Sequence, residues 1–237
     1  MLPTELGLMT ELILLSVNNN RITSGIPTQI GTVTELVIFD LNENEMIGTL
    51  PTELGKLTRL FALYLSFNTL TGTFPTDIGN LGNLTLFYIY ENELTGTLST
   101  ELGHFTSLEI FWVSDNHITC SIPTDVGNLA KLSQFAVYTN DMTGPLPSEL
   151  GDLTKLFSLA VNNNHLSITI PTELGNLTQL LSLNADGNHL TGSIPSELFL
   201  LTSLTSVSLS DNNITGTFPT ELGIMKQLNA FAANGKT

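Results

Sequence analysis

The sequence predicts an α/β solenoid: a right-handed coil with a parallel β-sheet on its concave face and short 3-10 or helical segments on its convex side. Two columns of residues that recur every 24 positions, without an insertion or deletion, lead to this prediction. A fixed period of this length indicates a repeat architecture in which each turn contacts only its neighbours. The asparagine column is Asn20, Asn44, Asn68, Asn92, Asn116, Asn140, Asn164, Asn188 and Asn212. The proline column is Pro3, Pro27, Pro51, Pro75, Pro123, Pro147, Pro171, Pro195 and Pro219, with Ser99 in its single gap.

The first part of each turn predicts a short strand. In Phe111-Trp112-Val113, alternate residues point to opposite faces, so Phe111 and Val113 face the core and Trp112 faces outward. We expect such strands near residues 14–18 and every 24 residues onward, paired in parallel at about 4.8 Å. The asparagine that ends each strand carries both a donor and an acceptor, so it can satisfy backbone groups where the chain bends inward.

The second part of each turn follows the pattern T-G-x-I-P, as in residues 191–195. We expect Leu190, Gly192 and Ile194 to face inward and their neighbours to face outward. Cys120 occupies the glycine column, and we interpret it as a small core residue. As the only cysteine it excludes an internal disulfide.

The third part spaces Leu198, Leu201 and Leu204 three residues apart, which predicts a short 3-10 or α-helical turn on the outer side. The strands crowd together while the outer segments are wider. The stack is therefore expected to curve, with its sheet on the concave face.

The complete pattern, L-x-x-L-x-L-x-x-N-x-L-x-G-x-I-P-x-x-L-G-x-L, resembles the plant-type leucine-rich repeat. That family includes receptor-kinase ectodomains, polygalacturonase-inhibiting proteins and algal surface proteins. The resemblance implies recognition of a peptide, protein or glycan on the concave surface, with no catalytic role and no cofactor. It also favours an extracellular or cell-surface location, although the sequence shows neither a signal peptide nor the paired-cysteine caps of secreted members. We expect residues 1–237 to form a single leucine-rich repeat domain of about nine and a half turns, an excerpt that lacks caps.

The composition limits the classes of partner and function that are compatible with this chain. A net charge of −15 argues against nucleic acid, which selects for arrays of Lys and Arg. No apolar run approaches the ~18 residues of a membrane span, so we expect no membrane insertion within this chain. No nucleophile motif or phosphate-binding loop is present, and we predict that the protein is not an enzyme.

The candidate binding site lies where the repeat columns vary. All four tyrosines and the single tryptophan fall in the outward positions of four consecutive turns, and we expect Tyr64, Tyr88 and Trp112 to stack as a ladder. Clustered exposed aromatics of this size mark a recognition surface. These outward columns hold carboxylates but no Lys or Arg, so a cationic or neutral partner fits best. The predicted ligand-binding residues are Tyr64, Phe67, Tyr88, Tyr90, Glu91, Trp112, Asp115 and Tyr138.

The column directly after the ladder asparagines contains residue types that can bind a metal ion. His117, Asp141, His165 and His189 occupy equivalent positions in successive turns, and the two last histidines stand close enough to share a divalent ion. The same column holds Arg21 elsewhere, which is typical of a solvated rim. We therefore predict no metal site.

The alternative function is ice binding. Thr-x-Thr pairs beside the glycine column resemble the arrays of solenoid antifreeze proteins, with alternate residues about 6.7 Å apart and successive turns about 4.8 Å apart. The residues of this alternative are Thr49, Thr71, Thr73, Thr95, Thr97, Thr119, Ser121, Thr191, Ser193, Thr215 and Thr217. Sequons at Asn83, Asn176 and Asn213 would carry glycans if the protein is secreted, although the repeat itself favours N-L-T.

Overall fold

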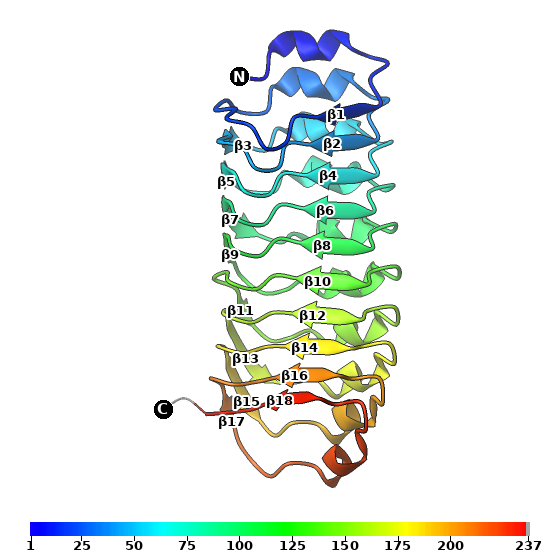
Figure 1. Cartoon of the computed structure of the whole chain (residues 1–237), viewed down its shortest axis with the longest axis vertical. Helices are drawn as coiled ribbons and strands as arrows, with labels where there is room; N and C mark the ends of the chain where they lie inside the picture. Colours follow the sequence, from blue (N-terminus) through cyan, green and yellow to red (C-terminus); the bar gives the residue numbers. More distant parts are fainter. Residues whose placement is uncertain (236–237) are drawn as a thin grey trace.

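The computed structural model describes residues 1–235 and confirms the solenoid (Figure 1). One parallel sheet of ten strands runs the length of the stack on the concave face. Equivalent residues pair in direct register, as Tyr64 does with Tyr88 and Tyr88 with Trp112. The strands are β1 (Leu14–Ser16), β2 (Ile38–Asp40), β4 (Ala62–Tyr64), β6 (Leu86–Tyr88), β8 (Ile110–Trp112), β10 (Gln134–Ala136), β12 (Ser158–Ala160), β14 (Ser182–Asn184), β16 (Ser206–Ser208) and β18 (Ala230–Ala232).

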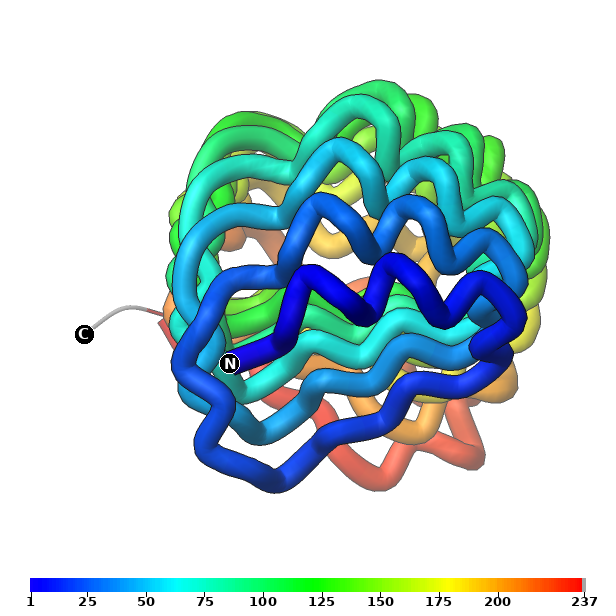
Figure 2. Tube along the Cα trace, turned by 90° about the horizontal axis from the view of Figure 1, so that it is seen from above, coloured from blue at the N-terminus to red at the C-terminus, as the bar shows by residue number. Residues whose placement is uncertain are grey.

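Short 3-10 helices form the convex side, one in each turn, and the stack twists along its axis (Figure 2). Each begins directly after the residue of the proline column. They are η1 (Thr4–Leu8), η2 (Thr28–Thr32), η3 (Thr52–Lys56), η4 (Thr76–Asn80), η5 (Thr100–His104), η6 (Thr124–Asn128), η7 (Ser148–Asp152), η8 (Thr172–Asn176), η9 (Ser196–Leu200) and η10 (Thr220–Ile224). Glycine recurs inside them because neighbouring turns approach closely: a Cβ on Gly55 would overlap the carbonyl oxygen of Asp77.

The flank between sheet and helices carries two further parallel sheets of four strands each. The first is β3 (Ile47–Thr49), β5 (Thr69–Gly72), β7 (Glu93–Thr97) and β9 (His117–Thr119). The second is β11 (Thr143–Gly144), β13 (His165–Thr169), β15 (His189–Gly192) and β17 (Asn213–Ile214).

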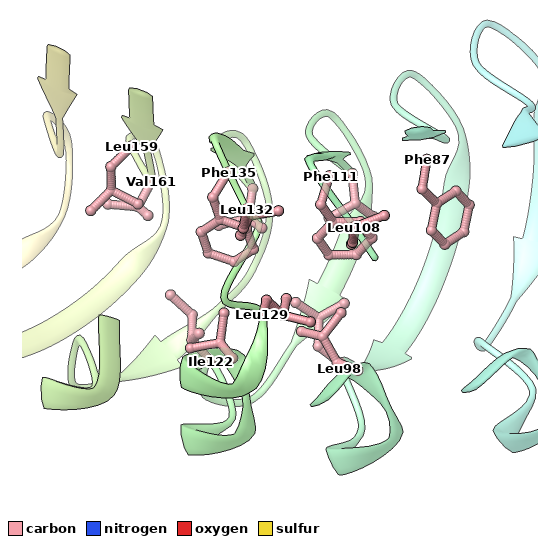
Figure 3. Packing of buried hydrophobic residues seen from close by; sticks show 14 of the residues in the cluster. Phe87, Leu98, Leu108, Phe111, Ile122, Leu129, Leu132, Phe135, Leu159 and Val161 are labelled. Carbon is pink, nitrogen blue, oxygen red and sulfur yellow. The ribbon is translucent and has the colours of Figure 1, made fainter. Parts of the chain in front are cut away.

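The core is a continuous column of apolar side chains enclosed by the coil. Beneath the middle of the concave sheet it becomes aromatic. Phe87, Phe111 and Phe135 follow one another at centroid distances of 5.5 and 6.0 Å (Figure 3). All three are almost fully buried, as the alternation within each strand predicted.

The asparagine column forms the expected row of buried amides. Asn116 donates from Nδ2 to the carbonyl oxygens of Ile89, Val113 and Ser114, at 3.0 to 3.2 Å. Its Oδ1 accepts the N–H of Leu94, in the preceding turn, at 2.9 Å. One side chain thereby satisfies four backbone groups and joins adjacent turns.

The interpretation of Cys120 as a core residue is wrong. Its side chain is exposed, and its φ is +65°, a left-handed conformation that the glycines of the same column share. Gly192, which we also expected inside, has a φ of +73° and is only partly buried. This column is glycine-rich because the backbone bends here, since a residue without a Cβ enters the left-handed region at no steric cost.

Candidate functional site

The concave sheet places the predicted aromatic residues together. Because β4, β6 and β8 pair in register, Tyr64, Tyr88 and Trp112 lie side by side on the outward face, while Phe87 and Phe111 point into the core. We refer to Tyr64, Phe67, Tyr88, Tyr90, Trp112 and Tyr138 together as the aromatic patch.

The rings of the patch touch, but they do not form the stacked ladder that we expected. Tyr64 and Tyr88 are 5.3 Å apart and tilted by 32°, and Tyr88 meets Trp112 edge to face at 4.9 Å and 89°. Edge-to-face packing places the positive edge of one ring on the negative face of the next, which is favoured over a face-to-face sandwich. The patch is therefore a cluster of crossed rings rather than a flat platform.

The second outward column extends this cluster toward the ends of the strands. Tyr90 contacts Phe67 at 5.1 Å, Tyr88 at 6.4 Å and Trp112 at 5.9 Å, always at a steep angle. Tyr138, also half-buried, lies close enough to act electrostatically on the Tyr90 phenol. The structure thus joins all six predicted aromatic residues on one face.

A third outward column, at the first residue of each concave strand, was missed by the sequence analysis. Leu86 and Ile110 are half-buried and pair in register beside the aromatic patch. In β12, β14 and β16 the same position holds serine. The 24-residue period carries this contrast in the sequence.

The predicted carboxylates stand where the strands end. Glu43, Glu91 and Asp115 each precede a ladder asparagine and adopt φ values of +52° to +54°. Within residues 1–235, no hydrogen bond or ion pair engages the carboxylate of Glu91 or Asp115. These two acids are therefore available to a partner.

Two other concave carboxylates are already engaged within the fold. Asp40 accepts hydrogen bonds from the Ser16 hydroxyl and the Asn18 amide, at 3.1 and 2.6 Å. Asp186 accepts from the Ser208 hydroxyl and the Ser210 N–H, at 2.6 and 2.5 Å. Their internal bonds leave less capacity for a ligand than Glu91 and Asp115 retain.

The pKa values of three phenols in the patch are raised, for Tyr64, Tyr88 and Tyr90. Burial raises the pKa of Tyr64 and the carboxylate of Asp40 adds to this, while burial and then the neighbouring phenols Tyr64 and Tyr90 raise the pKa of Tyr88. Burial also raises the pKa of Tyr90, followed by the charges of Tyr138, Glu43 and Glu91. Each of these three phenols remains a hydrogen-bond donor at neutral pH.

Two bulky residues of the patch region adopt left-handed backbone conformations. Phe67 has a φ of +55° with a side chain 41% exposed, and Thr139 has a φ of +49°. Equivalent positions elsewhere hold Asn, Glu, Asp or Gly. Strain of this kind gathers at functional sites. Beside Phe67, the Ser66 hydroxyl is buried and is unpartnered in the described part of the chain.

The histidine column forms a chain of contacts along the rim. Asp141 lies 3.8 Å from His117 Nδ1 and 3.8 Å from His165 Nε2, and the His165 and His189 rings stack at 5.5 Å. Over residues 1–235, no group of three or more His, Cys, Asp or Glu side chains is arranged to hold a metal ion.

The threonines of the ice-binding alternative are exposed or partly exposed on the flank, but their geometry differs from the expected grid. Flank strands pair with an offset of 22 residues, so Thr49 lies opposite Thr71 and Thr97 opposite Thr119. The ladder sets this offset: Asn68 binds the N–H of Met46, which places the next residue, Thr69, opposite Ile47. Equivalent threonines of successive turns are therefore staggered.

Both threonine columns also contribute to packing between turns. The Thr119 hydroxyl donates to the carbonyl oxygen of Gly96 at 3.0 Å, and Thr95 does the same to Gly72 at 3.4 Å. The methyl group of Thr73 packs over Gly96, where a Cβ would lie only 2.5 Å from it. The threonines thus have structural roles in addition to any role at the surface.

Comparison with known proteins identifies the repeat. A leucine-rich repeat model matches residues 59–81, 107–129, 179–201 and 203–225, and the fold between these segments repeats the same turn. The chain contains leucine-rich repeats. No sequence among the curated proteins matches it.

Solved structures place this leucine-rich repeat chain beside plant receptor ectodomains. The plant peptide hormone receptor RGFR1, in complex with RGF2, superposes with a TM-score of 0.96 and 34% identity, over 98% of this chain and 38% of the receptor chain. The Arabidopsis receptor kinase HAESA, in complex with the peptide hormone IDA and the co-receptor SERK1, gives 0.95 and 32%, over 98% and 39%. This chain therefore spans less than two fifths of those structures.

A plant ice-binding protein shares the fold at a TM-score of 0.69 and 24% identity, over 95% of this chain and 81% of that one. The comparisons indicate a binding scaffold and no catalytic family. The helices of residues 1–235 are all too short for a membrane span.

Proposed function

We propose that this protein is a non-enzymatic recognition module that binds its partner through the aromatic patch and the carboxylates of Glu91 and Asp115. One observation carries the proposal: six aromatic side chains touch one another or lie in close range on the outward face of the concave sheet. Tyr and Trp dominate the energetics of binding interfaces because their large rings bury much area at little entropic cost.

The preference of aromatic residues for strands does not account for the patch. In the same sheet, the outward positions that follow Trp112 are Ala136, Ala160, Asn184 and Ser208, and these strands pair equally well. Phe67, a bulky side chain at a position that is left-handed in neighbouring turns as well, also falls within the aromatic region. Leu86 and Ile110 lie there too, and Leu14 and Ile38 continue this apolar position into β1 and β2. These independent features support a surface adapted for binding.

The class of partner that we propose is a peptide, a protein or a glycan, cationic or neutral. The receptors RGFR1 and HAESA were solved with peptide hormones, which supports a peptide for this chain. The outward columns of the concave strands contain no Lys or Arg, and the net charge is −15, which argues against nucleic acid as the partner. We place this recognition outside the cell or at its surface.

Trp112→Ala tests the proposal. The variant and the parent are applied to arrays of glycans and peptides, and affinities are measured for every hit. If Trp112 is a central contact, the variant loses about 2 kcal/mol of binding free energy, or roughly 30-fold in affinity, without unfolding. Asn184→Ala, at the same strand position three turns away, is the matched control. Ligands whose affinity is unchanged in Trp112→Ala would show that the binding site lies elsewhere.

Ice binding is the second candidate, favoured by the rows of exposed Thr and Ser on the flank sheets. It would use Thr71, Thr73, Thr95 and Thr97 without the aromatic patch. Thermal hysteresis and ice-crystal shape separate the two functions, measured for the parent and for a Thr73→Lys, Thr97→Lys double variant. Faceted crystals that the double variant abolishes would establish ice binding. Featureless discs from the parent at millimolar concentration would end this candidate.

A further inference from the structure

Resting on the proposed recognition function, we infer that the aromatic patch binds an arginine side chain of a peptide partner. The binding position lies at the corner formed by Tyr88, Tyr90 and Trp112, with Glu91 and Asp115 beside it. The observations that lead to this ligand are the angles between the rings, the position of the unused carboxylates and the apolar residues at the start of the strands.

The rings form a corner rather than a platform. Tyr88 and Trp112 cross at 89°, Tyr88 and Tyr90 at 76°, and Tyr90 and Trp112 at 62°, with centroids 4.9 to 6.4 Å apart. A cation is attracted to the negative face of an aromatic ring, and rings at steep angles present faces from several directions. A neutral sugar stacks best on a flat, open ring face, which crossed rings do not offer.

Negative charge completes the corner. Glu91 follows Tyr90 directly, and Asp115 occupies the equivalent position of the next turn. Glu43 and Glu91 act electrostatically on the Tyr90 phenol, so a negative potential reaches the ring cluster. Neither Glu91 nor Asp115 is engaged by a hydrogen bond or ion pair within residues 1–235, in contrast to Asp40 and Asp186. Their oxygens can therefore accept the N–H groups of a guanidinium.

Polarity changes along the strands in the order that an arginine requires. Leu86 and Ile110 begin β6 and β8, the rings follow, and the carboxylates stand at the end. The aliphatic stem of arginine packs on apolar and aromatic surface, while its planar head stacks on rings and pairs with carboxylates. Lysine lacks the planar head, so we expect it to bind more weakly here.

Trp112 provides the measurement, because the protein has no other tryptophan. Its fluorescence is followed during titration with the peptide Gly-Arg-Gly-Arg-Gly, with the same peptide carrying uncharged citrulline, and with neutral oligosaccharides. We expect saturable binding of the arginine peptide and at least about a tenfold loss with citrulline. Equal affinity for the arginine and citrulline peptides, or no response to the arginine peptide, would overturn the inference.

The experiment must distinguish binding at the corner from non-specific attraction of a cationic peptide, since the whole protein is acidic. Glu91→Gln removes one charge at the site, and Glu173→Gln removes one on the convex helix η8. We expect about three- to tenfold weaker binding for Glu91→Gln and no change for Glu173→Gln. Tyr88→Leu keeps every charge and removes one ring, and should weaken binding about tenfold. Unchanged affinity in Tyr88→Leu would show attraction by net charge only and would overturn the inference.

The outcomes also distinguish this inference from the proposed function. An oligosaccharide that binds and loses affinity in Trp112→Ala would leave the recognition function standing and replace the arginine ligand. If every ligand found by the arrays is insensitive to Trp112→Ala and to Tyr88→Leu, both proposals fail. Circular dichroism of each variant confirms that the fold is retained in these comparisons.

Discussion

Strands β8 and β14 lie three turns apart in one sheet, and they share an interior but not a surface. Phe111 and Leu183 are both almost fully buried at the centre of their strands. Asn116 and Asn188 make equivalent sets of four hydrogen bonds. Outward, however, β8 presents Ile110 and Trp112, and β14 presents Ser182 and Asn184.

The difference separates what the fold requires from what it leaves open. Inward positions must fill a continuous core, so they remain apolar in every turn. Outward positions meet no such demand, as the serine, alanine and asparagine surface of β12, β14 and β16 shows. A large aromatic residue on β8 is therefore not explained by stability. The aromatic part of the face is the part that we propose for recognition, and the polar part shows what the scaffold alone requires.

The largest expected loss of stability comes from a substitution in the core that β8 and β14 share. Phe111→Ala should lower the free energy of unfolding by about 3–5 kcal/mol, because it leaves a cavity between Phe87 and Phe135. Trp112→Ala, one residue away on the outward face, should cost less than about 1 kcal/mol. Denaturant unfolding of both variants measures the contrast. Equal losses would mean that the aromatic patch is part of the core.

The asparagine ladder provides the next comparison. Asn116→Ala and Asn188→Ala should each cost about 1–3 kcal/mol, because buried backbone groups lose their partners. Similar values are expected, since the two sites make the same bonds under different surfaces. Asn20→Ala, at an exposed position, serves as the control with a smaller loss. Melting temperatures equal to the parent in the two buried variants would contradict the prediction.

Two positions of the glycine column on the flank hold other residues, and they allow the comparison to be tested there. Cys120 lies in the turn that contains β8, and Ile168 in the turn that precedes β14, with φ values of +65° and +72°. Cys120→Gly and Ile168→Gly should each stabilise the protein by about 0.5–1 kcal/mol, because glycine relieves the left-handed strain. Ile168→Ala retains the strain and should bring no gain, as unfolding midpoints will show. A gain equal to that of Ile168→Gly would assign the effect to the lost side chain.

The smallest expected effect is a loss of stability at alkaline pH. It arises from the aromatic patch, which contains all four tyrosines. The pKa values of Tyr64, Tyr88 and Tyr90 are raised in the fold, chiefly by burial. Unfolded tyrosine ionises near pH ~10, so above that pH the unfolded state loses protons first and stability falls as the pH rises. Unfolding free energies measured across this range should decline, and less steeply in Tyr88→Phe. A parent stability that is independent of pH there would contradict the assignment.

The repeating architecture of this protein could be predicted from its sequence. The period, the inward columns and the asparagine row were predictable because each follows from the same local requirement in every turn: apolar side chains fill the core and amides satisfy the bend. The aromatic residues could also be assigned to one face, since alternation within a strand fixes direction. Leu86 and Ile110 were equally predictable from that alternation and were overlooked.

The arrangement of side chains on these surfaces depends on contacts between turns. Tyr88 and Trp112 meet edge to face instead of stacking, because side-chain rotamers respond to all neighbours at once. Cys120 is exposed because the backbone bends at its position with a left-handed conformation, and this bend was not evident from the small residues of its column. The flank threonines are staggered because the asparagine ladder offsets one turn against the next by 22 residues. Each of these results depends on contacts between turns, and a repeat pattern gives the spacing of the turns along the chain but not their contacts in space.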